Sequence, residues 1–406
     1  MKILLINQSF VPPDEPGHTR HFEMAQYLRK CGHELVIVAS DSNYQTGLRT
    51  VDRKGLYIEQ VIDGVRVLRA YSAQTLHRSY FWRFVSFFSF MFSSVWAALQ
   101  VKDVDLVMGT TPPIFQAVSA WFVAFLRRKP FLLEVRDLWP EFAISMGVIR
   151  NPAVIRLAHW LEGFLYARAT HILVNSPAYK EYLVGKGVPG KKITFIPYGT
   201  DINMFNPSVD GSPVREKLGL KDKFIVLYAG AMGQAHDLYT VLRGAKCLSD
   251  EAHIQFVFFG AGKERARLEA EAHRLGLTNV LFAGVCPKKE MPLVVASADL
   301  CLAILQNIPM FRTTYPNKVF DYMAAGRPTV LVIDGVVREV IEASGGGVFV
   351  EPGNHELLAK TILELSRDAG RVRQMGQDAR TYLVKNLDRH DKLAETLRLL
   401  ERLVNR

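Results

Sequence analysis

Three neighbouring stretches indicate the fold class: KILLIN (2–7), HFEMAQYLRKCGH (21–33) and ELVIVAS (34–40). The first and third are short apolar runs, which are typical of buried strands. The middle stretch repeats apolar residues at helical spacing and reaches Gly32, a residue that suits the end of a helix. Strand, helix and strand within 40 residues predict a parallel βαβ unit, whose crossover we expect to be right-handed.

The same alternation continues in two runs, one before and one after a turn-rich segment at 195–208. We expect the apolar strands at 104–110, 130–137 and 170–176 in the first run, and at 223–233, 254–262, 279–284, 299–305 and 329–333 in the second. Two such runs predict two doubly wound α/β domains of similar size, which also suits a length of 406 residues. A charged, amphipathic stretch at 355–406 predicts two or three further helices.

The composition is that of an ordinary globular protein, with 49% apolar and 22% charged residues, which excludes intrinsic disorder. The four cysteines are scattered without a C-x-x-C pair, which excludes a disulfide scaffold and a cysteine zinc site and fits a reducing compartment. The apolar run after Lys2 is too short for a secretory signal, so we expect a cytoplasmic protein. The net charge of +10 is spread along the chain and suits polyanionic small molecules or anionic lipid as well as nucleic acid.

Residues 79–101, SYFWRFVSFFSFMFSSVWAALQV, break the pattern because they hold one charge, Arg83, and only small serines interrupt their apolar surface. A buried core helix, a transmembrane span and a helix lying in the membrane interface all fit this stretch. We favour the interfacial helix, supported by a second aromatic stretch at 120–131 that ends in three basic residues. The side chains expected in the membrane are Trp82, Phe87, Phe88, Phe92 and Trp96. The protein is then peripheral on the cytoplasmic face of the inner membrane, with an anionic membrane surface as a partner.

FRTTYPNKVFDYMAAGRP (311–328) carries the strongest chemical signal. It predicts a short helix with Thr313 or Thr314 as its N-cap. The free amide groups at its start, together with Lys318 on the first turn, are typical of a phosphate-binding terminus. Asp321, one turn further on, is placed to accept hydrogen bonds from ribose hydroxyls. An ordinary capped helix with a surface lysine is the other interpretation.

This segment resembles the second half of the E-x7-E region of retaining glycosyltransferases of family 4. Asp321 matches the second acid, which binds ribose in that family, and Thr313 stands where the first acid is expected. The segment is also similar to the P-[SN]-K-x-[FW]-[ED]-Y signature of transferases for bacterial O-antigen, capsule and exopolysaccharide. In that group the lysine, here Lys318, is expected to contact the donor diphosphate.

The resemblance implies the GT-B fold, in which two Rossmann-like doubly wound domains face each other across a cleft. Residues 1–197 are then the acceptor-binding and membrane-facing domain, and residues 198–385 the nucleotide-sugar domain. The resemblance further implies that a helix at 386–406 packs back on the first domain.

The resemblance runs the length of the chain and implies further contacts. In the first domain, it places the acceptor near His18, Thr19 and Trp139, and the catalytic centre near Glu134, Arg136 and Asp137. Arg136 would orient an anionic group while Asp137 or Glu134 contacts the acceptor hydroxyl; an ion pair between Arg136 and Asp137 is the structural alternative. The donor-binding residues implied are Gly17, Gly230, Gly233, His236, Gly260, Gly262, Val285, Thr313, Thr314, Tyr315, Pro316, Asn317, Lys318 and Asp321.

The loop YAGAMGQAHD (228–237) resembles the family's Y-x-G-x-x-G segment but lacks the arginine and lysine common there. This leaves Lys318 as the main cation, with His236 as a weaker substitute. Asn175 and Ser176 follow a strand and either touch ligand or serve as caps.

The expected reaction follows from charge. A nucleotide-sugar donor releases a nucleoside diphosphate, whose developing negative charge Lys318 and the helix amides can stabilise without a metal or other cofactor. The resemblance implies retention of the anomeric configuration, hexosyl or N-acetylhexosaminyl transfer from a UDP-sugar, and a polyprenyl-diphosphate-linked saccharide as acceptor. Two alternatives remain: a sugar-nucleotide 2-epimerase, and a non-catalytic membrane-bound partner of another transferase. We expect no nucleic acid as a partner.

Overall fold

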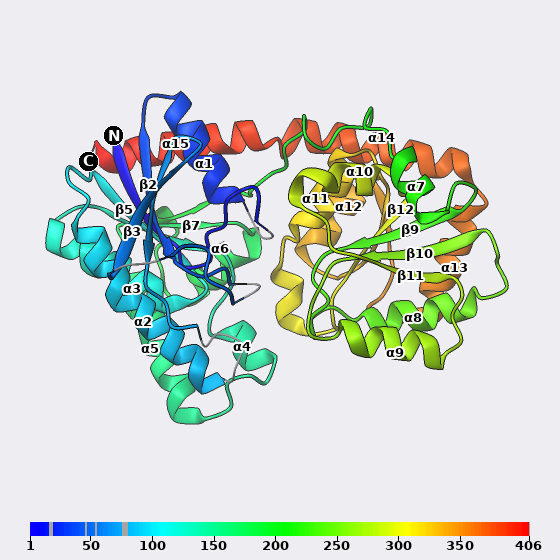
Figure 1. Ribbon diagram of the computed structural model, residues 1–406, viewed down its shortest axis with the longest axis horizontal. Helices are drawn as coiled ribbons and strands as arrows, with labels where there is room; N and C mark the ends of the chain where they lie inside the picture. Colours follow the sequence, from blue (N-terminus) through cyan, green and yellow to red (C-terminus); the bar gives the residue numbers. More distant parts are fainter. Residues whose placement is uncertain (16–18, 45–46, 53–54, 75–79, 406) are drawn as a thin grey trace. The chain divides into compact units, whose positions relative to one another are not determined.

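The chain forms two compact units in a computed structural model (Figure 1). Unit 1 comprises Met1–Pro197 and Leu393–Arg406, and unit 2 comprises Tyr198–Lys392. The structure describes residues 1–15, 19–44, 47–52, 55–74 and 80–405.

Unit 1 is built on an eight-stranded sheet in the order β3-β4-β2-β1-β5-β6-β7-β8, parallel except for the antiparallel pair β3–β4 at one edge. Its strands are β1 (Lys2–Ile6), β2 (Glu34–Ser40), β3 (Tyr57–Ile62), β4 (Val65–Ala70), β5 (Leu106–Thr111), β6 (Phe131–Val135), β7 (His171–Val174) and β8 (Ile193–Phe195). Its helices are α1 (Arg20–Lys30), α2 (Tyr80–Leu99), α3 (Ile114–Arg127), α4 (Glu141–Ser145), α5 (Pro152–Arg168), α6 (Pro177–Gly185) and the short η1 (Gly190–Lys192).

Helices cover both faces of this sheet. Leu28 of α1 and Leu400 of α15 (Arg389–Val404) share one buried core with Met108 of β5. Neighbouring residues on a strand point to opposite faces. A Cβ on Gly109 would lie 2.6 Å from the Cβ of Ala120 on α3, so α3 packs closely against the other face.

Unit 2 holds a six-stranded, all-parallel sheet in the order β11-β10-β9-β12-β13-β14. Its strands are β9 (Phe224–Ala229), β10 (Ile254–Phe259), β11 (Val280–Gly284), β12 (Leu300–Ile304), β13 (Thr329–Val332) and β14 (Gly347–Phe349). Its helices are α7 (Ser212–Leu218), α8 (Leu238–Cys247), α9 (Arg265–Arg274), η2 (Lys288–Glu290), α10 (Met291–Ala296), η3 (Pro309–Thr313), α11 (Asn317–Ala324), α12 (Val336–Ser344), α13 (His355–Ser366) and α14 (Ala369–Asn386).

In both units the direction in which strands are added reverses once. The reversal lies between β1 and β5 in unit 1 and between β9 and β12 in unit 2. In open α/β sheets, ligands bind beside such a reversal, at the carboxyl ends of the strands. The topology therefore points to one candidate binding edge in each unit.

The two Rossmann-like α/β units confirm the predicted fold class, and all the expected strands are present. The pattern missed the β3–β4 hairpin and the three-residue strands β8 and β14, which are too short or too exposed to show a clear apolar run. The segment 79–101 contains α2, which contacts β2, β4 and α3 and so belongs to unit 1. By length and composition alone, Trp82–Leu99 could cross a membrane. Only a third of this stretch is buried inside the protein. It is therefore not a wholly buried core helix.

Candidate functional site

Helix α11 places a lysine beside the carboxyl end of β9. The hydroxyl of Tyr322 accepts a hydrogen bond from the amide of Ala229 (3.0 Å) and donates one to the carbonyl of the same residue (3.2 Å). Lys318 lies one helical turn before Tyr322 and on the same face. Its Nζ consequently lies over the ring of Tyr228, 4.0 Å from the ring centroid.

Gly230 is needed where this ammonium meets the backbone. It has a φ of +152°, and a Cβ built on it would lie 2.5 Å from Nζ of Lys318. A side chain at this position would displace the ammonium. The glycine therefore lets the cation lie directly against the turn that follows β9.

Lys318 is a buried cation without a counter-charge. Its Nζ is shielded from solvent and has no hydrogen-bond partner in the part of the chain that the structure describes. Burial lowers the pKa of Lys318 to about 7. Buried charges are normally paired, because an unpaired one loses its hydration without compensation. An anion at this position would supply the missing partner.

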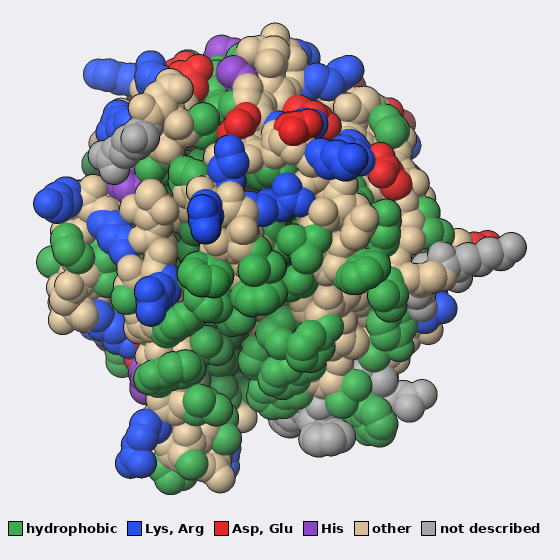
Figure 2. Space-filling model, turned by 90° about the vertical axis from the view of Figure 1, so that its left-hand side faces the viewer, with side chains coloured by type: hydrophobic (Ala, Val, Ile, Leu, Met, Phe, Trp, Pro, Cys, Tyr) green, Lys and Arg blue, Asp and Glu red, His purple; other side chains and the backbone are tan. Residues whose placement is uncertain are grey.

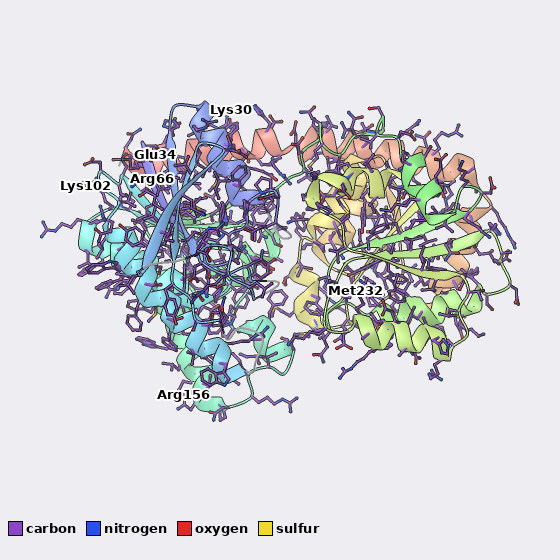
Figure 3. All side chains as sticks on the ribbon, viewed as in Figure 1. Lys30, Glu34, Arg66, Lys102, Arg156 and Met232 are labelled. Carbon is purple, nitrogen blue, oxygen red and sulfur yellow. The ribbon has the colours of Figure 1, made fainter. Side chains whose placement is uncertain are left out.

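Two loops after β9 and β10 pack with their backbones in contact. The amide of Gly230 donates to the carbonyl of Phe259 (2.9 Å), and that of Met232, labelled in Figure 3, donates to Ala261 (2.8 Å). A Cβ on Gly260 would collide with the carbonyl oxygen of Gly230. The glycines therefore keep the backbone free of side chains at the edge where Lys318 lies.

His236 is close to Lys318 but cannot be a second cation at neutral pH. Burial, helped by the charge of Lys318, lowers the pKa of His236 to about 3. Its Nδ1 is buried and has no hydrogen-bond partner among the described residues. The imidazole is therefore neutral and can contribute hydrogen bonds only, so it adds no charge beside Lys318.

Asp321 is already engaged in this structure. Its carboxylate accepts hydrogen bonds from the hydroxyl of Thr200 (3.1 Å) and from Nζ of Lys288 (2.9 Å). Lys288 also lies over the ring of Phe205, 4.6 Å from its centroid. A ribose at Asp321 would share the carboxylate with these groups. Lys288 was missed from the sequence, although a basic pair in the loop after β11 was a usable signal.

The predicted N-cap of α11 was wrong. The helix begins at Asn317 after Pro316, and no side chain caps it. The hydroxyls of Thr313 and Thr314 donate to carbonyls of the turn formed by η3 (2.6 and 2.8 Å). Because the threonines satisfy the preceding turn, the first amides of α11 stay without a side-chain cap.

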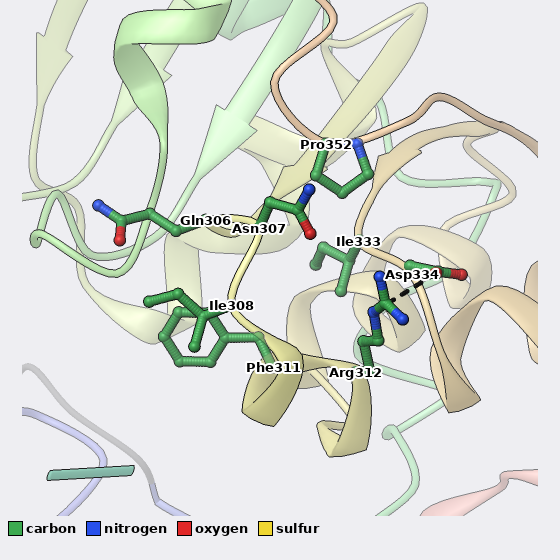
Figure 4. Close-up of a pocket in the computed structure, with 8 residues that line it drawn as sticks. All are labelled: Gln306, Asn307, Ile308, Phe311, Arg312, Ile333, Asp334 and Pro352. Atoms are coloured by element: carbon green, nitrogen blue, oxygen red, sulfur yellow. Dashed lines mark ion pairs between the residues drawn. The ribbon is translucent and has the colours of Figure 1, made fainter. Parts of the chain in front are cut away.

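A small hollow lies among the loops that follow β12 and β13 (Figure 4). The ion pair between Arg312 and Asp334 (3.5 Å) lines it. Its volume of about 10 Å³ is room for a single water molecule. The hollow as it stands does not hold a sugar.

Two predicted donor-binding residues lie outside this hollow. Tyr315 lies in the loop between η3 and α11, edge-on against Phe320 at 5.4 Å. Val285, expected to read the base, is exposed after β11.

The corresponding edge of unit 1 carries a buried cluster of paired charges. Glu134 of β6 accepts hydrogen bonds from Arg20 (2.5 Å) and from Nε2 of His21 (2.9 Å), and Nδ1 of His21 lies 2.8 Å from the side-chain amide of Asn7. Burial, followed by the charge of Arg20, lowers the pKa of His21 to about 4. Burial opposes ionisation of Glu134, but Arg20, His21 and Arg136 together outweigh it and lower its pKa.

Glu134, expected at the catalytic centre, is engaged within this cluster. Its two oxygens are bound by Arg20 and His21, and its contact with the acceptor hydroxyl stays a prediction. Neither Arg20 nor His21 was foreseen, although both stand at the start of a predicted helix that follows a strand. Thr19 is also engaged, since its hydroxyl donates to Glu23 (2.6 Å). Gly17 and His18 lie outside the described residues.

Arg136 and Asp137 do not form the ion pair that was the structural alternative. Arg136 donates to the carbonyls of Thr111 (3.0 Å) and Pro112 (2.9 Å), and the described residues show no pairing with Asp137. Asp137 lies on an exposed turn and hydrogen bonds Tyr179. Separately, Trp139 packs edge-on against a phenylalanine of α3 at 6.2 Å.

Neutral oxygen atoms remain without partners at this edge of unit 1. The buried side-chain oxygens of Gln8, Thr111 and Asn175 have no hydrogen-bond partner in the described ranges of the chain. They follow or end β1 and β5, the two strands that flank the reversal, and β7, which is separated from β5 by β6. A molecule rich in hydroxyl groups would satisfy them. Within the described residues, no three His, Cys, Asp or Glu side chains are grouped to hold a metal.

Comparison with protein families matches both units. A family described as "Glycosyl transferase 4-like domain" matches residues 17–199, and one described as "Glycosyl transferases group 1" matches residues 212–382. WcaI of Escherichia coli (strain K12), named for colanic acid biosynthesis, is 25% identical over 97% of this chain and 98% of its own length. A GDP-mannose-dependent alpha-mannosyltransferase of Mycobacterium tuberculosis is 24% identical over 88% of this chain and 85% of its own.

Solved structures share the fold. HepE of Anabaena in complex with UDP aligns with a TM-score of 0.73 over 99% of this chain and 100% of its own, at 18% identity. A sucrose-phosphate synthase of Thermosynechococcus elongatus aligns with a TM-score of 0.78 over 99% and 98%, also at 18% identity. Both matched families are glycosyltransferases, which supports a transferase over the epimerase and the non-catalytic partner.

Proposed function

Because the chain belongs to the GT-B glycosyltransferases, we propose that it transfers a sugar, with retention, from a UDP-sugar to a lipid-linked saccharide. Unit 2 then binds the donor and unit 1 the acceptor. The observation that carries this assignment is the buried, unpartnered ammonium of Lys318 at the strand reversal of unit 2.

The donor diphosphate accounts for the unusual state of Lys318. A bound diphosphate restores a partner to the ammonium and holds it protonated. The first amides of α11 supply further donors at the same edge, and Gly230 leaves the ammonium free of side-chain crowding. As the bond between sugar and diphosphate breaks, negative charge grows on the leaving group, so these contacts stabilise the transition state more than the bound donor.

The relatives bear on the choice of nucleotide and of acceptor. HepE binds UDP, whereas the name of the mycobacterial relative specifies GDP-mannose, so GDP-mannose is the competing donor. WcaI is named for the synthesis of a polysaccharide. The acceptor hydroxyl would be bound by the free neutral oxygens of unit 1, at Gln8, Thr111 and Asn175. A polyprenyl-diphosphate-linked saccharide supplies such hydroxyls and is consistent with these relatives.

A donor screen tests the assignment. Purified full-length protein is incubated with UDP-sugars or GDP-mannose and a polyprenyl-diphosphate disaccharide, and nucleoside diphosphate release and glycoside formation are both measured. We expect release coupled to a glycoside whose anomeric configuration, read by NMR, matches that of the donor. If only GDP-mannose gives coupled release, the donor nucleotide is GDP and not UDP. A product of inverted anomeric configuration would refute retention. Absence of coupled release from every donor would contradict the proposed reaction.

A further inference from the structure

Helices α2, α3 and α5 expose large apolar side chains on one side of unit 1. Figure 2 shows them gathered as a broad hydrophobic area bordered by basic side chains. The most exposed are Phe92 (70%), Trp96, Phe125 (66%), Leu126, Leu157 and Trp160. We call these six residues the aromatic face. Contiguous apolar patches of this kind mark an interaction surface, whereas single exposed side chains do not.

The aromatic face is preformed because the three helices are fixed to each other. Arg127 of α3 donates to the carbonyls of Ala98 (3.2 Å) and Leu99 (2.9 Å) at the end of α2. Trp121 of α3 contacts Phe164 of α5 edge-on, with ring centroids 4.7 Å apart. No ordering of loose segments is therefore needed before this surface binds.

The inner side of α2 anchors that helix to the sheet. Ser86 hydrogen bonds Ser72 (2.9 Å), Ser93 donates to the carbonyl of Tyr71 (2.6 Å), and Phe90 is fully buried. One side of α2 is thus committed to the protein and the other faces outward. This division suits a helix that lies flat on a surface and does not suit one surrounded by lipid.

Basic residues outnumber acidic ones around the aromatic face. The three helices and the turn after α3 carry Arg83, Arg127, Arg128, Lys129, Arg156 and Arg168. Their single acidic residue, Glu162, is buried and paired with Lys186 (2.5 Å). Lys102 and Arg156 extend away from the body of unit 1 in Figure 3. The partner must therefore be apolar where it meets the rings and anionic around them.

We propose that the aromatic face of unit 1 docks into the headgroup region of an anionic lipid bilayer. Phe, Trp and Leu side chains enter the boundary between headgroups and acyl chains, and the surrounding Arg and Lys bind lipid phosphates. A second copy of this chain fits less well, since pairing the same face would bring two basic borders together. The docking does not depend on the transfer of a sugar. Only its purpose rests on the proposed function, since docking would hold the enzyme where a lipid-linked acceptor lies.

Co-sedimentation with vesicles tests the docking. Full-length protein is mixed with vesicles of phosphatidylglycerol and phosphatidylcholine, or of phosphatidylcholine alone. The test variant combines F92S, F125S and W160S, which alter exposed side chains only. The matched control combines L357S and V384S, which remove exposed apolar side chains from unit 2. Circular dichroism and nucleotide binding check that each variant is folded.

We expect the wild type and the control to bind the anionic vesicles, more weakly as salt rises, and the test variant to bind about tenfold or more weakly. Equal binding by a folded test variant, or no binding by the wild type, would overturn the docking. A wild-type dimer that the test variant abolishes, without vesicle binding, would assign the face to a second copy and equally overturn it. Vesicle binding by a wild type that releases no nucleoside diphosphate would refute the proposed function and leave the docking standing.

Discussion

The two sheets reverse their strand order in the same way but place opposite chemistry at the reversal. At this edge of unit 1 the described residues hold paired buried charges, Glu134 with Arg20 and His21, and neutral oxygens without partners, such as that of Asn175. At the edge of unit 2 the buried groups without partners include a cation, Lys318. A shared topology thus sets where ligands bind, while the residues after the strands decide whether the edge takes an anion or a hydroxyl-bearing molecule.

Replacing the cation of unit 2 should have the largest effect. We expect Lys318→Met to lower kcat/KM by about 30- to 1,000-fold, or about 2–4 kcal/mol of transition-state stabilisation. The same change removes a buried unpartnered amine, so Tm of the free protein should rise by a few degrees. Steady-state kinetics and thermal unfolding measure the two effects. Lys289→Met, at an exposed lysine of η2, is the control. If Lys318→Met has wild-type kinetics, Lys318 does not bind the donor, and the two edges do not differ in binding an anion.

Crowding the glycine turn should weaken donor binding next most strongly. A methyl group at Gly260 meets the carbonyl oxygen of Gly230 and forces the two loops apart. At about 1–3 kcal/mol of strain, Gly260→Ala should weaken nucleotide affinity by about tenfold to a hundredfold, measured by calorimetry. Gly370→Ala, where the added methyl meets only Oδ1 of Asp368 at 3.5 Å, should leave the affinity unchanged. If Gly260→Ala binds the nucleotide with wild-type affinity, the backbone of these two loops does not form part of the donor site.

Disrupting the paired charges of unit 1 should affect stability and spare the donor. In Glu134→Gln, Arg20 loses its buried counter-charge, and the free energy of unfolding should fall by about 2 kcal/mol. Chemical denaturation measures this change, and Glu59→Gln, which breaks an exposed pair with Arg66, should cost under about 1 kcal/mol. Nucleotide affinity should stay at the wild-type value. Loss of that affinity in a protein of unchanged stability would contradict the separation of roles.

The smallest effect is expected at the neutral oxygens of unit 1. Asn175→Ala removes one hydrogen-bonding side chain, worth about 1 kcal/mol, so KM for the acceptor should rise about fivefold. KM for the donor should not change. The exposed Asn203 of unit 2 provides the control variant Asn203→Ala. A rise in donor KM with an unaltered acceptor KM would reverse the assignment of the two units.

Apolar runs predicted the central strands of both sheets, because buried parallel strands are almost continuously hydrophobic. The hairpin β3–β4 was missed because residues of β3 such as Glu59 are exposed at an edge. Lys318 was predictable from its position at the start of a helix after a strand. The pairing of Arg20 with Glu134 and of Lys288 with Asp321 was not predictable, since the partners lie 114 and 33 residues apart in the sequence. Long-range pairs of this kind depend on packing, which a single sequence does not display.

The proton balance of nucleotide binding shows whether a diphosphate is the partner of Lys318. Burial lowers the pKa of Lys318 to about 7 in the free protein, and a bound diphosphate must raise it. Calorimetry of UDP binding in buffers of different ionisation enthalpy should show the wild type taking up about 0.9 proton more than Lys318→Met at pH 8, and only about 0.1 more at pH 6. Subtracting the proton uptake of Lys318→Met from that of the wild type removes the contribution of UDP itself. Equal proton uptake and equal affinity in the two proteins would contradict a diphosphate partner for this ammonium.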